Sequence, residues 1–110
     1  MDCDLVVTGD VVLTDRIIPQ GFVAVRGGRV VAFGEGRGPS AAERHDHAGA
    51  CILPGAIDAQ VHSRSQAGQE GFAWSTRSAA AGGVTTIVDM PYDDGDLIAS
   101  ADRLRAKAEE

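Results

Sequence analysis

The chain has 110 residues, a length that fits one small domain or part of a larger one and excludes a complete barrel of roughly 250 residues. Hydrophobic residues make up 44% and charged residues 24%, which is typical of a folded protein and excludes a disordered or membrane-spanning chain. Ten Lys and Arg residues against sixteen Asp and Glu residues give a net charge of -6, so we expect neither nucleic acid nor a membrane as partner.

The first half of the chain is predicted to form short strands separated by turns. Five short apolar runs bounded by turn-forming residues predict strands: residues 5–8, 11–14, 21–26, 29–33 and 50–53. Gly27-Gly28 can supply the positive φ that a tight two-residue turn requires, so the third and fourth strands are expected to pair antiparallel. Residues 35–42 contain two glycines and a proline and predict an exposed loop.

At Pro54-Gly55 the pattern changes to an alternation of strands and helices. In chain order we expect a strand, a helix, a strand and a helix over residues 56–62, 70–81, 84–90 and 97–109. Such alternation predicts parallel strands joined by helical crossovers. The glycines at 82 and 83 predict the end of the first helix, and Asp96 predicts the start of the second.

Most of the side chains suited to chemistry lie at the end of the first strand of this second half. Side chains alternate along a strand, so Asp58, Gln60 and His62 are expected to share one face. In a barrel enzyme the C-terminal ends of the strands carry the metal ligands and the substrate contacts. Arg64 follows with the same parity and can hold a carboxylate or carbonyl through its planar donor group.

Two motifs of the second half resemble the start of a cyclic amidohydrolase. The first is Pro-Gly-Ala-Ile-Asp-Ala-Gln-Val-His at residues 54–62, and the second is Ala-Ala-Ala-Gly-Gly-Val-Thr-Thr at residues 79–86, followed by Asp-Met-Pro. The chain is most similar to allantoinases and dihydroorotases, with hydantoinases more distant. The resemblance implies an α/β fold: a small β-sandwich over residues 1–53, then the first two βα units of an incomplete TIM-type barrel over residues 54–110.

The resemblance also implies hydrolysis of a non-peptide C–N bond in a small cyclic amide or ureide, by water activated at a dinuclear zinc centre. His62 matches the second histidine of the family's metal-binding pair, and Gln60 occupies the position of the first. An amide oxygen is a poor ligand for Zn²⁺. Asp58 matches an aspartate that orients a ligand, and Arg64 and Tyr92 occupy positions that contact substrate. The other ligands and the catalytic proton acceptor come from later strands, so no catalytic residue is assigned to this chain.

Several alternatives stay open. Gln60 favours two alternative interpretations, a non-catalytic scaffold and a truncated product that is inactive. His45-Asp46-His47 has the spacing of a metal-binding pair, although a solvated linker is the favoured interpretation. Asp89 could line a catalytic face or cap the following turn. Acidic residues near the N-terminus and two distant cysteines favour the cytoplasm, and for a full-length protein we expect a homo-oligomer.

Overall fold

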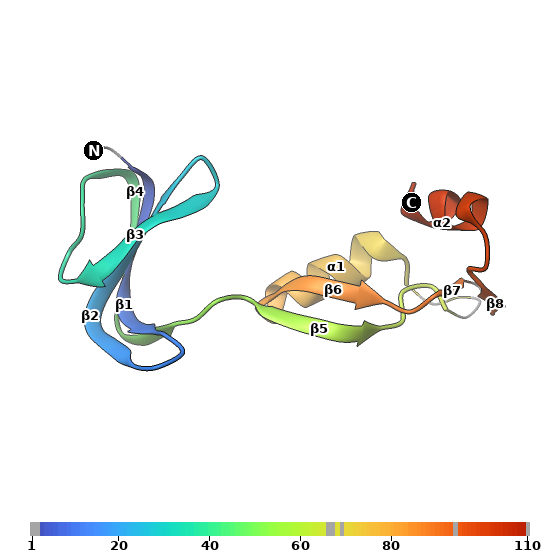
Figure 1. The fold of residues 1–110 in the computed structure, drawn as a ribbon, viewed down its shortest axis with the longest axis horizontal. Coiled ribbons are helices and arrows are strands. Elements are labelled where there is room, and N and C mark those ends of the chain that lie inside the picture. Colours follow the sequence, from blue (N-terminus) through green and yellow to red (C-terminus); the bar gives the residue numbers. More distant parts are fainter. Residues whose placement is uncertain (1–2, 66–67, 69, 94, 110) are drawn as a thin grey trace. The chain divides into compact units, whose positions relative to one another are not determined.

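The computed structural model describes residues 3–65, 68, 70–93 and 95–109, and it is mostly β, with two helices among these residues (Figure 1). The chain divides into two compact units, Met1–Pro54 and Gly55–Glu110. Neither described helix has the length and apolar character of a membrane span.

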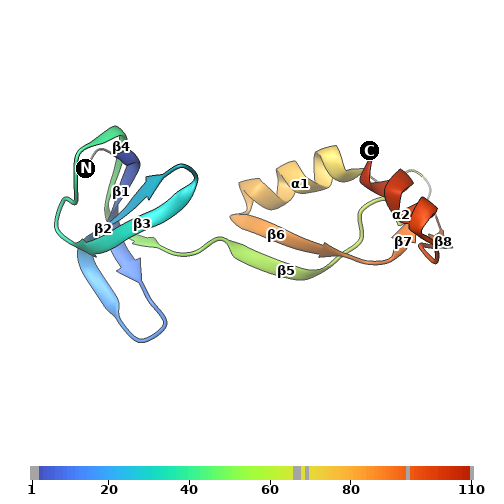
Figure 2. The same cartoon turned by 45° about the horizontal axis from the view of Figure 1, so that its top comes forward.

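The first unit is a four-stranded mixed sheet. Its strands are β1 (Cys3–Val12), β2 (Ile17–Arg26), β3 (Arg29–Glu35) and β4 (Ala41–Ile52). They lie side by side in the order β3-β2-β1-β4, as the blue to green part of the chain in Figure 2 shows. The pairs β1–β2 and β2–β3 are antiparallel, whereas β1 and β4 are parallel.

The predicted hairpin between the third and fourth apolar runs is confirmed. Arg26 and Arg29 are antiparallel partners, and Gly27 and Gly28 between them have φ values of 58° and 71°. Such φ values are costly for residues that carry a Cβ. The Gly27 amide also donates a 2.6 Å hydrogen bond to the Asp4 carboxylate, which fixes the turn against the start of β1.

Residues 5–8 and 11–12 of the two predicted strands 5–8 and 11–14 belong to the single strand β1, so their separation was wrong, and residues 13–14 lie beyond the end of the strand. The predicted turn is instead marked by register irregularities, between Gly9 and Val11 in the pairing with β2 and between Thr8 and Asp10 in the pairing with β4. A Cβ on Gly9 would lie 2.7 Å from the Ala50 carbonyl oxygen, so the glycine permits β4 to pass close by.

The predicted loop 35–42 and the predicted linker around His45 are also corrected. The loop is limited to the residues between β3 and β4, and His45-Asp46-His47 lies inside β4. This strand has little β-branched character, and its formation follows from pairing with β1, where Val7 faces His45 and Thr8 faces Asp46. Cross-strand pairing therefore overrides weak local propensity here.

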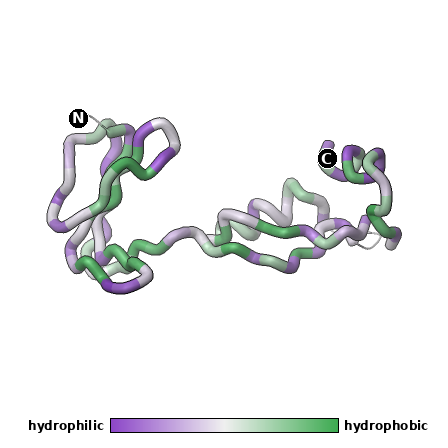
Figure 3. The backbone as a smooth tube through the Cα atoms, in the orientation of Figure 1, coloured by the Kyte–Doolittle hydropathy of each residue, from purple (hydrophilic) through white to green (hydrophobic). Residues whose placement is uncertain are grey.

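The core of the first unit is small. Cys3, Val6 and Ala24 form a buried apolar cluster, against which Phe22 and Ala41 pack. Large apolar side chains elsewhere in the unit stay exposed, among them Phe33 at 51% and Leu53 at 63%. The apolar segments along its strands are green in Figure 3.

The second unit contains a parallel strand pair, two helices and a short hairpin. Its elements are β5 (Ala56–Val61), α1 (Phe72–Ala81), β6 (Val84–Asp89), β7 (Tyr92–Asp93), β8 (Asp96–Leu97) and α2 (Ala101–Ala108). β5 and β6 pair in parallel, as predicted, and α1 joins them. The predicted end of α1 is confirmed, because Gly82 caps the helix and Gly83 follows with φ 81°.

Helix α2 begins four residues later than predicted. Its N-cap is Ser100, whose hydroxyl accepts a 3.3 Å hydrogen bond from the Arg103 amide. Asp96 instead lies in β8, where its carboxylate accepts from the Leu97 amide at 2.9 Å and pairs with the Arg103 guanidinium at 2.5 Å. The acidic residue that predicted a helix start thus stabilises the turn of the β7–β8 hairpin.

Candidate functional site

The three polar residues predicted to share a face of the first parallel strand are all exposed. Asp58 and Gln60 lie in β5, and His62 follows it directly. A register irregularity falls between Asp58 and Val61, so strict alternation is interrupted inside the strand. The Asp58 carboxylate accepts a 3.1 Å hydrogen bond from the Gln60 backbone amide, which ties this side chain to its own strand.

The described residues do not form a zinc site. No group of three or more His, Cys, Asp or Glu side chains within residues 3–65, 68, 70–93 and 95–109 is placed to hold a metal ion. A structural or catalytic zinc needs three or four nitrogen, sulfur or carboxylate ligands. His62 supplies one imidazole and Gln60 only a neutral amide, so this donor set does not fit the dinuclear centre by itself.

Arg64 lies in the turn after β5 and is held by a carboxylate from the β7–β8 hairpin. Its Nε and Nη2 lie 2.9 Å and 3.2 Å from the two carboxylate oxygens of Asp93, a bidentate arrangement. The Arg64 backbone has φ 56°, and its amide donates to the Glu70 carbonyl at 3.0 Å. Tyr92 precedes Asp93 in β7 and is 40% exposed. The structure therefore brings the segments of the two predicted substrate-contacting residues together.

A buried polar cluster lies at the carboxyl ends of β5 and β6. Lys107 of α2 is only 4% exposed and lies with its ammonium 2.7 Å from Asp89 Oδ2, at the end of β6. The other carboxylate oxygen, Oδ1, accepts a 2.8 Å hydrogen bond from the Ser63 amide. Lys107 also donates to the Ser63 carbonyl at 3.1 Å and to the Tyr92 carbonyl.

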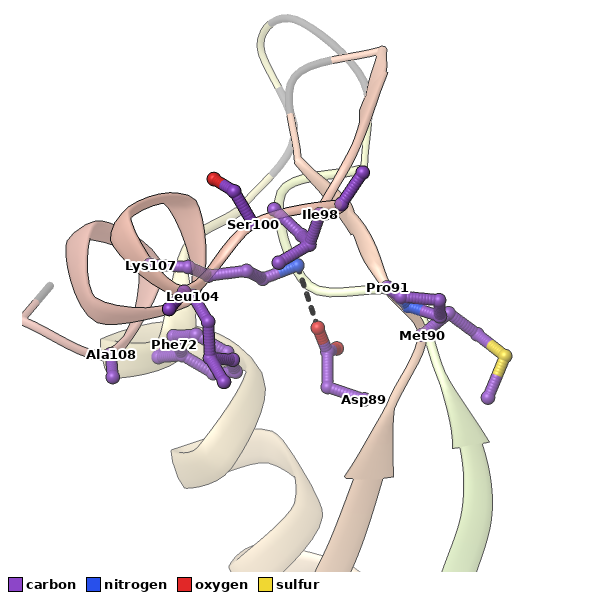
Figure 4. Close-up of a pocket in the computed structure, with 11 residues that line it drawn as sticks. Phe72, Asp89, Met90, Pro91, Ile98, Ser100, Leu104, Lys107 and Ala108 are labelled. Carbon is purple, nitrogen blue, oxygen red and sulfur yellow. Dashed lines mark ion pairs between the residues drawn. The ribbon is translucent and has the colours of Figure 1, made fainter.

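The surroundings of this cluster explain why the charges stay paired. The ammonium lies 5.6 Å from the centre of the Phe72 ring, and Figure 4 shows it reaching from α2 toward Asp89. Ser63 is fully buried, and its hydroxyl is 2.8 Å from that of Ser75 in α1. Asp89 Oδ2 accepts no hydrogen bond from the described residues, and its negative charge is balanced by the ion pair with the Lys107 ammonium.

A pocket of about 520 Å³ opens beside the cluster. Its walls are mainly apolar side chains from α1, α2 and the segment after β6: Phe72, Met90, Pro91, Ile98 and Leu104 (Figure 4). Lys107 and Asp89 contribute the charged part of its lining. The pocket and the ion pair thus lie at the edge of the parallel sheet where Arg64 is also held.

The resolved pKa shifts of the second unit belong to the ion pair between Asp96 of β8 and Arg103 of α2. The hydrogen bond from Arg103 is the main cause that lowers the pKa of Asp96 below its ordinary value of 3.8, and the Leu97 amide adds to it. The same pair raises the pKa of Arg103. In the first unit, a hydrogen bond from the Thr8 hydroxyl lowers the pKa of Asp46 on β4.

Lys107, Ser63 and Ser75 were not singled out from the sequence. The helical spacing could have identified Lys107. Lys107 and Ala108 lie three and four residues after Leu104, which places Lys107 on the apolar side of the predicted helix. A lysine among apolar positions of a helix requires a buried acceptor or anion. Asp89 was considered, but its partners were not foreseen.

The parallel strands with polar groups at their carboxyl ends agree with what the sequence motifs predict, and the chain is similar to the N-terminal portion of curated allantoinases. It is 37% identical over 106 residues to the allantoinase of Escherichia coli strain SMS-3-5 / SECEC, and 36% identical over 106 residues to that of strain HS, serotype O9:H4.

Both matches cover 94% of this chain. The chain spans 22% of the length of these curated relatives, about a fifth of each. No protein-family model matches the chain.

Proposed function

We propose that this chain provides the N-terminal β-sandwich strands and the first two strand–helix units of a TIM-type barrel in an allantoinase-like hydrolase. The complete enzyme would open a small cyclic ureide at a C–N bond. The observation that carries this proposal is the similarity to allantoinases over 94% of the chain. The parallel pairing of β5 and β6 supports it, because parallel strands joined by a helix are the repeating unit of such barrels.

The site residues take the following roles in this proposal. His62 would contribute one ligand to a zinc centre, with Gln60 at the neighbouring ligand position and Asp58 orienting the ligands. Arg64 and Tyr92 would contact the substrate. Zinc would supply the activated water in the complete enzyme. Since His62 is the single imidazole at the end of β5 and no group of three or more metal-ligating side chains forms among the described residues, the 110-residue chain by itself is proposed to be inactive. The full protein is proposed to be a cytoplasmic homo-oligomer.

A chimera tests the proposal directly. Residues 1–110 would replace the matching N-terminal region of the Escherichia coli SMS-3-5 allantoinase, with and without Gln60→His. In the presence of zinc, the Gln60→His chimera is expected to hydrolyse allantoin, and the Gln60 chimera is expected to do so about 100-fold more slowly. Losing a nitrogen ligand should weaken metal binding at least as much as losing a residue that only hydrogen-bonds to a ligand.

Allantoin, dihydroorotate and hydantoin would be assayed in parallel to identify the ring. Circular dichroism and the metal content of each chimera serve as controls for folding and loading. A folded, metal-loaded Gln60→His chimera that opens none of the three rings would contradict the enzymatic proposal.

Gln60 favours a second candidate, a non-catalytic relative that keeps the fold for assembly. This hypothesis expects the Gln60 chimera to fold and to assemble with little bound metal. Metal analysis separates the two candidates. Two zinc ions per chain in the Gln60 chimera, unchanged by Gln60→His, would rule the scaffold out.

A further inference from the structure

We propose that Lys107 is a positioning residue, which fixes the segment carrying His62 and Arg64 at the carboxyl end of β5. This inference rests on the proposed function for its catalytic meaning, whereas its structural content concerns the described residues alone. Lys107 belongs to α2, the last helix of the second unit, and contacts backbone atoms from two other segments as well as the Asp89 carboxylate.

The argument begins with the peptide planes around Ser63. The Ser63 amide belongs to the plane that it shares with His62, and this amide donates to Asp89 Oδ1 at 2.8 Å. The Ser63 carbonyl belongs to the plane shared with Arg64, and this oxygen accepts from Lys107 at 3.1 Å. The Lys107–Asp89 pair therefore holds both peptide planes between the two predicted site residues.

The same ammonium reaches the other side of the candidate site. Lys107 donates to the Tyr92 carbonyl, and the next residue, Asp93, holds the Arg64 guanidinium in a bidentate pair. The Lys107 ammonium thus holds the carbonyl of the residue before Arg64 and the carbonyl of the residue before Asp93. Displacing the ammonium would loosen Arg64 at both ends.

Burial makes this arrangement depend on a cation at position 107. The side chains of Lys107 and Asp89 are 5% and 13% exposed, so an apolar residue at 107 would leave the Asp89 carboxylate poorly solvated and unpaired. An arginine could retain the charge and donate to the same oxygens. Arg105 on the same helix is a matched control, because it is exposed and pairs only locally with Asp102, at 2.7 Å.

Hydrogen exchange of the 110-residue chain tests the inference without any activity. Lys107→Met is expected to accelerate exchange at the Ser63 amide by about tenfold or more, because a buried charge loses its partner, while amides of β2 stay unchanged. Lys107→Arg should restore most of the protection, and Arg105→Met should leave it intact. Equal exchange at Ser63 in Lys107→Met and Arg105→Met would overturn the proposal.

A second variant guards against general unfolding of the unit. In Asp89→Asn with Lys107→Met, both charges are removed together, so β6 is expected to stay protected while Ser63 still exchanges rapidly. If protection of Ser63 survives this double change, Lys107 does not position it and the inference is wrong.

The catalytic meaning is tested in the Gln60→His chimera. Lys107→Met is expected to lower kcat/KM for allantoin by about tenfold or more with unchanged zinc content, and Lys107→Arg to restore it. Unchanged kcat/KM in Lys107→Met would contradict the positioning role. If the parent chimera is itself folded, loaded and inactive, the proposed function fails, and the exchange data alone decide whether Lys107 fixes Ser63.

Discussion

Gly55 illustrates how a single atom constrains the start of β5. A Cβ at this position would lie 2.2 Å from both Oγ1 and Cγ2 of Thr85 and 2.7 Å from its Cβ. Real Cβ atoms do not approach other atoms so closely, so either strand would have to shift. The glycine of the Pro-Gly motif is thus explained by close packing of the residue before β5 against Thr85, the second residue of β6.

Gly55→Ala is therefore expected to lower the free energy of unfolding of the second unit by about 1–3 kcal/mol through overpacking. Trp74, the single tryptophan, lies in α1 and reports on this unit by fluorescence during urea unfolding. Thr85→Ala in the same chain should recover part of the loss, since it removes the two nearest atoms. Gly71→Ala is the control, because nothing lies within 4 Å of its added Cβ; equal losses in both variants would contradict the packing argument.

The lowered pKa of Asp96 predicts how the stability of the second unit depends on pH. Its folded pKa lies below the ordinary 3.8, chiefly through the Arg103 hydrogen bond, so its contribution to stability is present above pH 3.8 and is lost as the pH falls through the lowered value. Arg103→Met should raise the pKa of Asp96 toward 3.8, as measured by NMR titration of the carboxyl carbon. Arg105→Met should leave that pKa where it is. An unchanged Asp96 pKa in Arg103→Met would show that the ion pair does not form in solution.

At the scale of elements, α2 depends on a single side-chain cap. The Ser100 hydroxyl accepts from the Arg103 amide, and Asp102 in the first turn and Arg105 and Lys107 in the last favour the helix dipole. Ser100→Ala is expected to destabilise α2 by about 1 kcal/mol, whereas Ser100→Asp should preserve it. Amide exchange along residues 101–108 measures the effect. Equal protection in Ser100→Ala and the parent chain would exclude capping by this hydroxyl.

The sequence predicted the elements whose stabilising interactions are local. The Gly27-Gly28 hairpin, the end of α1 and the β5–β6 pair were recognised because turn chemistry and apolar runs encode them over a few residues. Of β4 it predicted only the end, with the strand at residues 50–53, because the preceding residues have weak strand propensity and pair with distant β1. It also misplaced the start of α2, because Asp96 and Ser100 both have capping side chains and only the three-dimensional pairing with Arg103 distinguishes them.

The candidate site shows the same division. Asp58, Gln60, His62, Arg64 and Tyr92 were selected by motif, and their roles remain predictions. The ion pair that holds Arg64 comes from Asp93, and the buried cluster depends on Lys107, which is distant in sequence from both strands. Such pairings arise from how α2 and the β7–β8 hairpin return to the strand ends, which no local pattern encodes.

At the scale of the whole molecule, the two units differ in how much apolar surface they bury. The buried apolar side chains of the described residues all belong to the first unit: Cys3, Val6, Val11, Ile18 and Ala24. In the second unit Ile57, Trp74 and Leu104 are each more than 60% exposed, at 69%, 64% and 61%. Since buried apolar area is the main source of stability, the second unit is expected to be the weaker one.

For the 110-residue chain we therefore expect the second unit to unfold at a lower urea concentration than the first. Trp74 fluorescence follows the second unit, and amide exchange of β1 and β2 follows the first. Within the proposed allantoinase chimera, the Trp74 region should become markedly more protected if the rest of the enzyme covers its exposed side chains. A single coincident transition of the isolated chain, with a stability above about 5 kcal/mol, would contradict this expectation.

The strand order of the first unit has a consequence for how the sheet assembles in time. β1, β2 and β3 pair with their neighbours along the chain, and such hairpins close within about 1–10 μs. β4 joins β1 in parallel only after the whole meander has been synthesised, and it pairs Ala41 with Cys3. The β1–β4 pairing joins residues that are farther apart in sequence than those of the other strand pairs in this sheet, so its loop-closure entropy is the largest. We therefore expect this pairing to set the folding rate of the sheet and β4 to be the last strand to gain protection during refolding.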